Sequence, residues 1–354
     1  MPRESTRVLV VDDSVFARKI VTDIISAAPN LTVAGTAANG VEGLAKVREL
    51  RPDVVTLDIE MPKMDGIETL RQLMAECPTP VVMVSSLTVS GARESMIALR
   101  LGAVDVMAKP HGSHSMGLTL QSDELIRKIN AAAEVDIGRL APLAAPVHAA
   151  RLGSRPRFGQ DFPIVMIASS TGGPRALRMV VPALSALSGA AFVAVQHIPE
   201  GFSAMLAQDL NEMSELTVRE AKDGDRPEPG TLLLAKAGYH LVMSRARTLN
   251  LTLSPPLWGV RPSADVTMVS AAPLFAQRLV GVVLTGMGSD GAAGLKSIKE
   301  RGGATIAEHE STCVVYGMPR VAIESGAVDI IAPIDKIPEA IEGAISSTAR
   351  RIAA

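Results

Sequence analysis

The sequence contains few of the residues that build disulfide frameworks, metal clusters or aromatic cores. Its 354 residues include two cysteines, and aromatic residues make up 3% of the chain. Cys77 and Cys313 lack the paired spacing of a metal or redox motif, which predicts two reduced thiols. Hydrophobic residues nevertheless make up 47% of the chain, so its cores must be aliphatic. Aliphatic runs favour parallel α/β sheets, whose central strands are buried on both faces.

Long apolar runs and clusters of positive charge are also missing. No uncharged apolar run reaches the roughly 18 residues that a membrane helix needs. The first residues, MPRESTRVLVVDD, lack the apolar region of a signal peptide. The formal net charge is -2, whereas nucleic-acid binding needs clustered cations. We therefore expect a cytoplasmic protein that is not inserted in a membrane and has no nucleic-acid partner.

The first domain, residues 1–137, alternates between short apolar segments and amphipathic helices. Its expected strands are Val8–Val11, Thr32–Gly35, Val54–Leu57, Val81–Val84 and Val104–Met107. Between them, apolar residues recur at three- and four-residue intervals, as in Val41–Leu50 and Ile67–Met74, which is typical of helices. Five such units in succession predict a flavodoxin-like, doubly wound parallel sheet of five strands.

A segment without periodicity, residues 138–161, separates this domain from a second one. Its repeated Pro, Ala, Gly and Arg predict an interdomain linker. The second domain, residues 162–354, is expected to be a doubly wound, mostly parallel α/β domain of the hydrolase type. Its expected strands are Pro163–Ala168, Ala191–Val195, Leu232–Ala235, Val280–Leu284, Ala304–Ala307 and Val328–Ile331. The stretch Thr231–Leu253 resembles antiparallel hairpins, which would make the sheet mixed.

Acidic, hydroxyl and lysine side chains follow the expected strands of the first domain. They are Asp12 and Asp13 after the first strand, Asp58 after the third, Ser85 after the fourth and Lys109 after the fifth. Because the carboxyl ends of parallel strands meet in one crevice, we expect these side chains to converge. Gathered carboxylates repel one another unless a hard cation such as Mg²⁺ joins them. The pattern predicts phosphoryl transfer to Asp58, with Lys109 neutralising the phosphoryl group and Ser85 hydrogen-bonding it.

The same residues resemble the receiver domain of two-component response regulators. The motifs that carry the resemblance are VVDDS, LDIEMPKMDG, VSS and AKP. The resemblance implies that a histidine kinase phosphorylates Asp58. It also implies Mg²⁺ held by Asp13, Asp58 and the main-chain carbonyl of Glu60, with Asp12 in the same acidic group. One departure concerns signal transmission, because Val106 occupies a position that is commonly an aromatic switch residue in the family.

The second domain begins with a strand that runs directly into the turn A-S-S-T-G-G-P. The spacing resembles the nucleophile elbow G-x-S-x-G centred on Ser170, with Ala168 in place of the first glycine. A serine hydroxyl needs a base, usually histidine, that is oriented by a carboxylate. His197 closes the next strand, and Asp290 follows a later strand in VVLTGMGSDG, so both belong to the same sheet edge. The pattern predicts a triad of Ser170, His197 and Asp290.

Neighbouring residues complete this hypothesis and leave alternatives open. We expect the main-chain N–H groups of Thr171 and Met287 to form the oxyanion hole. Ser169, directly beside Ser170, is a second candidate nucleophile. A Ser-Thr-Gly-Gly turn before a helix also occurs as a phosphate cradle, so the alternative is a response regulator with a non-enzymatic nucleotide-binding or protein-interaction output domain. Trp258 either lines a receptor-binding cleft or anchors its own loop.

The second domain resembles the catalytic domain of the chemotaxis protein-glutamate methylesterases. The motifs are IASSTGG, QHIPEGF, RPSAD, LTGMGSDGAAGL and CVVYGMP. The family triad maps onto Ser170, His197 and Asp290. The resemblance implies hydrolysis of glutamyl methyl esters on methyl-accepting chemotaxis receptors, with release of methanol, and deamidation of particular receptor glutamines. No cofactor is expected in this domain, and we expect the unphosphorylated receiver to obstruct the esterase until Asp58 is phosphorylated.

Overall fold

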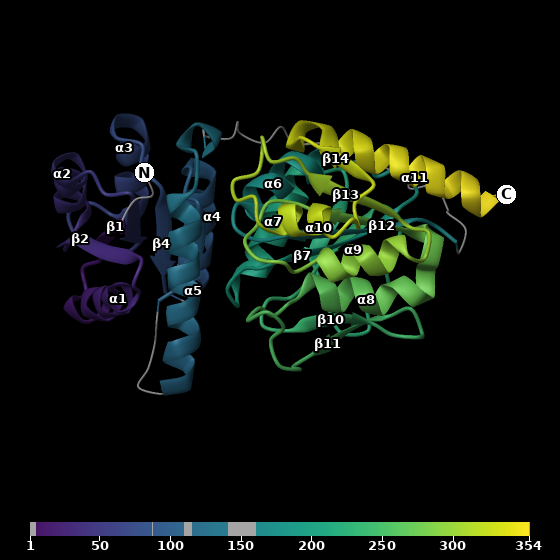
Figure 1. The fold of residues 1–354 in the computed structure, drawn as a ribbon, viewed down its shortest axis with the longest axis horizontal. Helices are drawn as coiled ribbons and strands as arrows, with labels where there is room; N and C mark the ends of the chain where they lie inside the picture. Colours follow the sequence, from purple (N-terminus) through teal and green to yellow (C-terminus); the bar gives the residue numbers. More distant parts are fainter. Residues whose placement is uncertain (1–4, 87, 110–114, 141–160, 354) are drawn as a thin grey trace. The chain divides into compact units, whose positions relative to one another are not determined.

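The chain forms two compact units, Met1–Ala144 and Ala145–Ala354, which are described separately (Figure 1). The structure is a computed structural model that describes residues 5–86, 88–109, 115–140 and 161–353. Most of the predicted linker, residues 138–161, falls outside the described residues.

The first unit contains a five-stranded sheet in the order β2-β1-β3-β4-β5. Its strands are β1 (Thr6–Val11), β2 (Leu31–Ala37), β3 (Val54–Asp58), β4 (Val81–Ser85) and β5 (Asp105–Ala108). All four pairings are parallel. Strands β3 and β4 are buried along their whole length because helices cover both faces of the sheet. The predicted flavodoxin-like sheet is confirmed, and each predicted strand ends within two residues of the observed one.

Helices flank this sheet on both faces. They are α1 (Val15–Ala27), α2 (Gly40–Leu50), α3 (Gly66–Glu76), α4 (Val89–Leu101) and α5 (Ser115–Ala133), followed by the short helix η1 (Ile137–Leu140). Helices α1 and α5 contact each other, and α3 contacts both α2 and α4. The first four helices begin at capping side chains, which are Ser14, Asn39, Asp65 and Thr88. Each cap satisfies an N–H group that the helix leaves free and stabilises it by about 1 kcal/mol.

The second unit is built on a seven-stranded sheet in the order β14-β13-β12-β6-β7-β9-β8. The strands are β6 (Ile164–Ser169), β7 (Ala191–Gln196), β8 (Thr217–Glu220), β9 (Thr231–Leu234), β12 (Leu279–Val283), β13 (Ala304–Glu308) and β14 (Ile330–Ala332). All six pairings are parallel. The predicted mostly parallel sheet with an antiparallel hairpin is confirmed, but the hairpin is separate from the main sheet, so the main sheet itself is not mixed. Edge strand β8 was not predicted, since its sequence TVRE is half polar.

The hairpin consists of β10 (His240–Met243) and β11 (Leu249–Thr252), which pair with each other in antiparallel register. It packs against helix α8 (Ala264–Phe275) and lies beside it in Figure 1. The predicted hairpin character of Thr231–Leu253 thus holds for its second half. The first part, β9, is a buried strand of the main sheet, in agreement with its all-apolar run of three leucines.

The remaining helices of the second unit pack around the main sheet. They are α6 (Gly173–Val180), α7 (Phe202–Met213), α9 (Ala292–Lys299), α10 (Met318–Glu324) and α11 (Ile337–Ala353). Strands β6 and β7 are buried at every position, and the core around them is mainly aliphatic. Burying each of the larger aliphatic side chains stabilises the fold by about 1.5–3 kcal/mol, and these strands form a rigid base for the residues that follow them.

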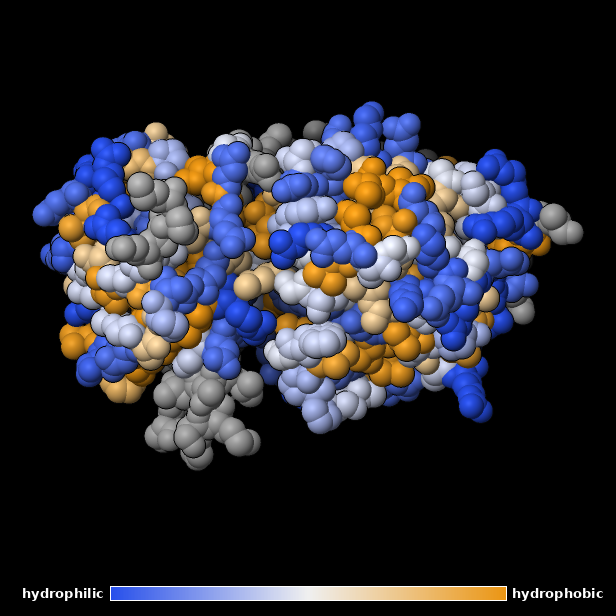
Figure 2. All heavy atoms as spheres, in the orientation of Figure 1, coloured by the Kyte–Doolittle hydropathy of each residue, from blue (hydrophilic) through white to orange (hydrophobic). Residues whose placement is uncertain are grey.

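Apolar side chains reach the surface of the second unit in two places in Figure 2, over β14 with α10 and over α8. The exposed residues there are Ile330 and Ile331 of β14 and Val269 of α8. Exposed apolar residues in such small numbers are common on folded proteins. Among the helices that the structure describes, none has the length and apolar character needed to span a bilayer.

Candidate functional site

Three strand ends meet at the centre of the second sheet. Strand β6 lies between β7 on one side and β12 on the other, and all three run parallel. The chain leaves β6 toward β7 and later returns on the opposite side as β12, so the strand order reverses at β6. Such a reversal opens a crevice at the carboxyl ends of the strands, where α/β proteins place their ligands.

Ser170 occupies a tight turn between β6 and α6. Its N–H donates to the Thr285 carbonyl oxygen at 3.0 Å, and its carbonyl oxygen accepts from the Gly173 N–H at 2.7 Å. Gly172, which precedes the helix, has φ +77, a conformation that favours glycine. The turn is closely packed, because a Cβ on Gly172 would clash with Val314. Val314 therefore packs against this turn and leaves no room for a side chain at position 172.

The two adjacent serines have different environments. The Ser169 side chain is 0% exposed, and its Oγ donates to Gln196 Oε1 at 2.7 Å. Ser170 is partly exposed and lies against the loop that follows β12, since a Cβ placed on Gly286 would lie 2.7 Å from Ser170 Cβ. Of the two hydroxyl-bearing residues, Ser170 is the one that a substrate can reach.

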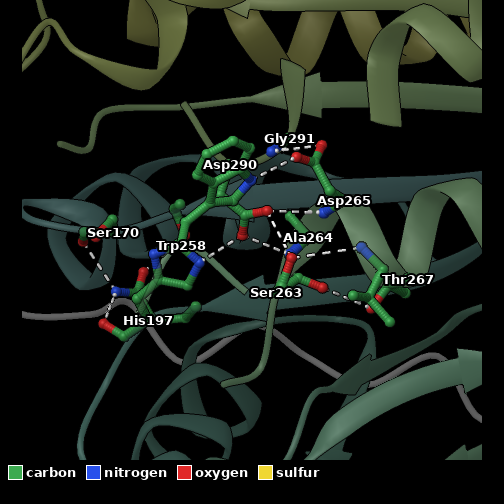
Figure 3. A network of polar contacts seen from close by, with 12 residues as sticks. Ser170, His197, Trp258, Ser263, Ala264, Asp265, Thr267, Asp290 and Gly291 are labelled. Carbon is green, nitrogen blue, oxygen red and sulfur yellow. Dashed lines mark hydrogen bonds and ion pairs between the residues drawn. The ribbon is translucent and has the colours of Figure 1, made fainter. Parts of the chain in front are cut away.

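His197 and Asp290 form a direct pair. His197 Nε2 lies 2.8 Å from Asp290 Oδ2, and the Asp290 side chain is only 3% exposed. Figure 3 shows the two residues joined at the centre of a polar network, with Ser170 on the far side of the histidine ring. Because Nε2 faces the carboxylate, Nδ1 is the ring nitrogen left for a proton transfer on the Ser170 side.

Ser170 and His197 lie close together through a shared partner. Gln196 Nε2 donates to the carbonyl oxygens of Ser170 and His197, each at 2.8 Å. Among the described residues, no hydrogen bond joins the Ser170 hydroxyl to the His197 ring. Such bonds are often long before substrate binds and tighten only in the reacting complex. The structure therefore brings the three predicted residues to one place, with the His197–Asp290 contact formed.

The start of helix α8 holds the Asp290 carboxylate. Oδ1 accepts from Ser263 Oγ at 2.6 Å and from the Asp265 N–H at 2.9 Å, and Oδ2 accepts from the Ala264 N–H at 2.6 Å. Burial raises the pKa of Asp290, but the bonds from His197, Ser263 and Asp265 outweigh it and leave the pKa below its ordinary value. Asp290 is therefore ionised at neutral pH, as a residue that stabilises an imidazolium must be.

A second buried carboxylate, Asp265, anchors the segments around Asp290. Its Oδ1 accepts from the N–H groups of Gly291 at 2.9 Å and Gly294 at 2.7 Å. Its Oδ2 accepts from Trp258 Nε1 at 3.3 Å, as Figure 3 shows. Burial raises the pKa of Asp265, and the charge of Asp290 raises it further. Trp258 itself is 63% exposed, so its N–H bond anchors the loop while much of its indole remains open to solvent.

The residues expected in the oxyanion hole lie on the two loops beside Ser170. Thr171 is buried, and its carbonyl oxygen accepts from Thr285 Oγ1 at 3.0 Å. Met287 is 38% exposed and follows Gly286, the residue in contact with Ser170. The loop turns back at Gly288, which has φ +95. The role of the two N–H groups as oxyanion donors stays a prediction.

The acidic site of the first unit lies at the carboxyl ends of β1, β3 and β5. Lys109 Nζ lies 2.8 Å from Asp58 Oδ2 and 2.9 Å from Asp12 Oδ2. Carboxylate oxygens of Asp12, Asp13 and Asp58 lie within 4.8 Å of one another. A pocket of about 590 Å³ opens beside them, and Glu60 and Lys109 are among the residues that line it. The predicted convergence of these side chains is therefore present.

The electrostatics of this cluster fit a bound cation. Burial raises the pKa of Asp58 to about 6, and the charge of Asp12 adds to the increase against the opposing effect of Lys109. One lysine thus leaves the anionic cluster incompletely neutralised, and oxygen ligands of this kind suit Mg²⁺.

Two other positions singled out in the sequence are buried. Ser85 at the end of β4 is 1% exposed, and Val106 in β5 is 1% exposed.

The residues that hold Ser170, His197 and Asp290 in place were not identified from the sequence. Gln196, Ser263 and Asp265 stand beside the predicted residues or within quoted motifs, yet they received no role. Ser263 had a detectable signal, because a serine before an apolar helix is a typical N-cap. The partners of Gln196 and Asp265 are set by tertiary contacts and gave no local signal.

Known protein families match both domains of the chain. The family model described as response regulator receiver domain matches residues 8–120, and the model described as CheB methylesterase matches residues 165–341. A crystal structure of the CheB methylesterase catalytic domain from Thermotoga maritima is similar with a TM-score of 0.50 and 42% sequence identity. The match covers 52% of this chain and 98% of that one.

Two relatives are similar along nearly the whole length. A protein of Symbiobacterium thermophilum, named protein-glutamate methylesterase/protein-glutamine glutaminase, is 48% identical over 350 residues, which are 96% of this chain and 97% of the relative. A protein of the same name from Geobacillus kaustophilus is 46% identical over 342 residues, which are 96% of this chain and 98% of that relative.

Proposed function

The chain belongs to the CheB methylesterase family and carries a response regulator receiver domain, and we propose that phosphorylation of Asp58 activates a Ser170–His197–Asp290 esterase. The chain is a protein-glutamate methylesterase and protein-glutamine deamidase, as its family is. Its substrates are glutamyl methyl esters and particular glutamines of methyl-accepting chemotaxis receptors. The observation that carries the proposal is the His197–Asp290 hydrogen bond beside the accessible Ser170 turn.

The proposed chemistry is acyl transfer to Ser170. The Ser170 hydroxyl attacks the ester carbonyl carbon, and His197 takes the hydroxyl proton at Nδ1 while Nε2–H remains bonded to Asp290. The imidazolium returns this proton to the leaving methoxide, so methanol departs and a glutamyl ester of Ser170 remains. Water, deprotonated by the same nitrogen, then attacks this ester, and the proton passes to the Ser170 oxygen as the glutamate is released. Deamidation follows the same steps with ammonia as the leaving group.

Asp290 and the neighbouring loops serve this reaction in different ways. The ionised Asp290 fixes the ring orientation of His197 and stabilises the imidazolium. The N–H groups of Thr171 and Met287 would bind the oxyanion of the tetrahedral intermediate, a contribution of about 3–4 kcal/mol per donor in serine hydrolases. The glycine-rich turn at Gly286 allows the backbone to approach the Ser170 side chain.

The receiver site would accept a phosphoryl group from a histidine kinase. Asp58 is the nucleophile, Lys109 pairs with the phosphoryl oxygens, and Ser85 donates a hydrogen bond to them. Mg²⁺ would be held by Asp13, Asp58 and the Glu60 carbonyl, with Asp12 beside them, and would neutralise phosphoryl charge. Residues 138–161 would link this receiver to the esterase domain, so that the esterase responds to a kinase. Because its partners are a histidine kinase and chemotaxis receptors, we expect the esterase to act in the cytoplasm.

Methanol release from methylated receptor membranes tests the proposal. We expect wild type to release methanol faster when acetyl phosphate and Mg²⁺ are added, and Ser170→Ala to lose roughly 10³-fold or more of the activity under both conditions. Ser169→Ala is the matched comparison, since it removes the neighbouring hydroxyl, and its loss should be no more than about tenfold. Full activity of Ser170→Ala, or loss confined to Ser169→Ala, would show that the nucleophile is assigned wrongly.

A further inference from the structure

We propose that Ser169 and Gln196 form a clamp that sets the distance between Ser170 and His197, which makes both of them positioning residues for the esterase. This inference rests on the proposed triad and deepens it. It assigns a role to the extra hydroxyl in the Ser169–Ser170 pair, which the triad itself does not use.

The Gln196 amide uses both of its N–H groups and its oxygen at the triad. Its Nε2 donates to the carbonyl oxygens of Ser170 and His197, both at 2.8 Å. Its Oε1 accepts from Ser169 Oγ at 2.7 Å. Gln196 is 2% exposed and Ser169 is 0% exposed. Water therefore has little access to compete for these bonds, and breaking one would leave a buried polar group without its partner.

The network permits one orientation of the amide. If the amide were flipped, Oε1 would face two carbonyl oxygens that can only accept hydrogen bonds. In the orientation found, Ser169 donates to Oε1 and so directs Nε2 toward the two carbonyls. Ser169 thereby acts on the triad through Gln196, although its own side chain contacts neither His197 nor Asp290 in the described hydrogen bonds.

The clamp lies where the main-chain hydrogen bonding between β6 and β7 ends. The last ladder bond runs from the His197 N–H to the Ser169 carbonyl oxygen at 3.1 Å, and beyond it Ser170 and His197 leave the sheet. Gln196 joins the two residues at this point. Since the Ser170 hydroxyl and the His197 ring have no direct bond among the described residues, backbone positions determine how closely they approach. Misplacement of about 1 Å in such a pair costs up to 10²-fold in rate.

The first turn of α6 is shaped to admit the clamp. A Cβ on Gly173 would collide with Gln196 Oε1 and would lie 2.8 Å from Ser169 Cβ. Any side chain at this position would push the amide away from the Ser170 carbonyl. The second glycine of the STGG motif therefore makes room for the clamp.

A double-mutant cycle on the full chain tests the clamp. The variants are Ser169→Ala, Gln196→Met and their combination, assayed with acetyl phosphate and Mg²⁺ on methylated receptor membranes. We expect Ser169→Ala to lower kcat about five- to tenfold and Gln196→Met roughly 30- to 100-fold, with KM changed less than about twofold. In the Gln196→Met background, Ser169→Ala should cause no further loss, because it acts only through the amide.

A matched variant separates positioning from general loss of stability. Ser214 is 2% exposed, and its hydroxyl donates to the Val181 carbonyl oxygen at 3.3 Å and accepts from the Leu216 N–H at 3.1 Å, so Ser214→Ala removes buried serine bonds elsewhere in the same unit. We expect Ser214→Ala to keep the wild-type kcat even where it lowers the free energy of unfolding as much as Ser169→Ala does.

Two results would overturn the clamp. One is a wild-type kcat in both single variants, and the other is a double variant whose losses multiply as if the two sites were independent. Ser170→Ala, assayed beside them, distinguishes this failure from failure of the proposed function. If Ser170→Ala is inactive while the clamp variants retain full kcat, only the clamp is wrong. If Ser170→Ala retains activity, the triad itself is wrong.

Discussion

Asp58 ends a buried strand of a parallel sheet and Asp290 lies in the loop after another, yet their surroundings shift their pKa values in opposite directions. Asp58 receives one N–H, from Ile59 at 2.8 Å, and shares the Lys109 ammonium with Asp12. Burial therefore prevails, and the pKa of Asp58 rises to about 6.

Asp290 is equally buried but is held by more donors. A hydroxyl and two main-chain N–H groups at the start of α8 bind it, in addition to His197. These bonds outweigh the effect of burial, and its pKa falls. The comparison shows how carboxylates at the carboxyl ends of two parallel sheets come to have different charge environments. An incompletely neutralised carboxylate suits a nucleophile that awaits a cation and a phosphoryl group, whereas a fully bonded carboxylate suits a permanent anion that orients an imidazole.

The largest expected effect concerns the partner of Asp290. His197→Ala should lower kcat by roughly 10⁴-fold or more, because the Ser170 hydroxyl then has no base. Methanol release with acetyl phosphate present is the measurement. His309→Ala is the control, since the ring of this exposed histidine hydrogen-bonds the nearby Ser311 in the described contacts, and the variant should remain at the wild-type rate. Comparable activity of the two variants would remove His197 from the mechanism.

The next effect concerns the stability of the receiver. A folded-state pKa of about 6 for Asp58 lies above its unfolded value of about 3.9, so ionising it costs about 2–3 kcal/mol of folding free energy above pH 6. This cost is absent below about pH 4, grows between about pH 4 and pH 6, and is constant above that. Asp58→Asn should therefore stabilise the receiver by about this amount at pH 7.5 and have no such effect at pH 4, as measured by calorimetry of the full chain.

The same measurement on Asp290→Asn should give the opposite change in stability. Because the pKa of Asp290 is lowered, its contribution to stability is present above the ordinary carboxyl pKa and is lost as pH falls through the folded-state value. Asp290→Asn should destabilise the esterase unit at pH 7.5, and the difference should shrink in acid. Stabilisation by Asp290→Asn, or destabilisation by Asp58→Asn at pH 7.5, would contradict the assigned charge states.

The smallest effects concern Asp265, which holds the loop around Asp290 without touching His197 in the described contacts. Asp265→Asn should lower kcat roughly tenfold, because an amide N–H group would face either the Trp258 N–H or the glycine N–H groups. Trp258→Phe keeps an aromatic ring but removes the 3.3 Å bond to Asp265, and it should change kcat by about twofold or less. A larger loss in Trp258→Phe than in Asp265→Asn would show that the indole itself contacts substrate.

Much of the fold could be predicted from the sequence because the buried strands are continuous apolar runs. Strand β6, IVMIAS, is an example, and its observed ends differ from the predicted ones by one residue. Strand β8 escaped prediction because an edge strand buries few of its side chains. The parallel placement of β9 depends on pairing with β7, a long-range contact that a local pattern does not contain.

The candidate sites could be predicted to the level of residue types at strand ends. Asp58 and Lys109 meet as expected because carboxyl ends of parallel strands converge. The sequence did not indicate which histidine nitrogen faces Asp290, nor that the start of α8 would supply donors to its carboxylate. Both features depend on the path of residues 258–265 back to the loop after β12, which only tertiary structure determines.

The most direct test of the division of roles between the two carboxylates is methanol release by wild type, Asp290→Asn and Asp58→Asn, each with and without acetyl phosphate and Mg²⁺. We predict that Asp290→Asn is roughly 10⁴-fold slower under both conditions, while Asp58→Asn keeps the basal rate of the unphosphorylated wild type and does not respond to acetyl phosphate. Near-wild-type turnover by Asp290→Asn, or a full response to acetyl phosphate by Asp58→Asn, would contradict it.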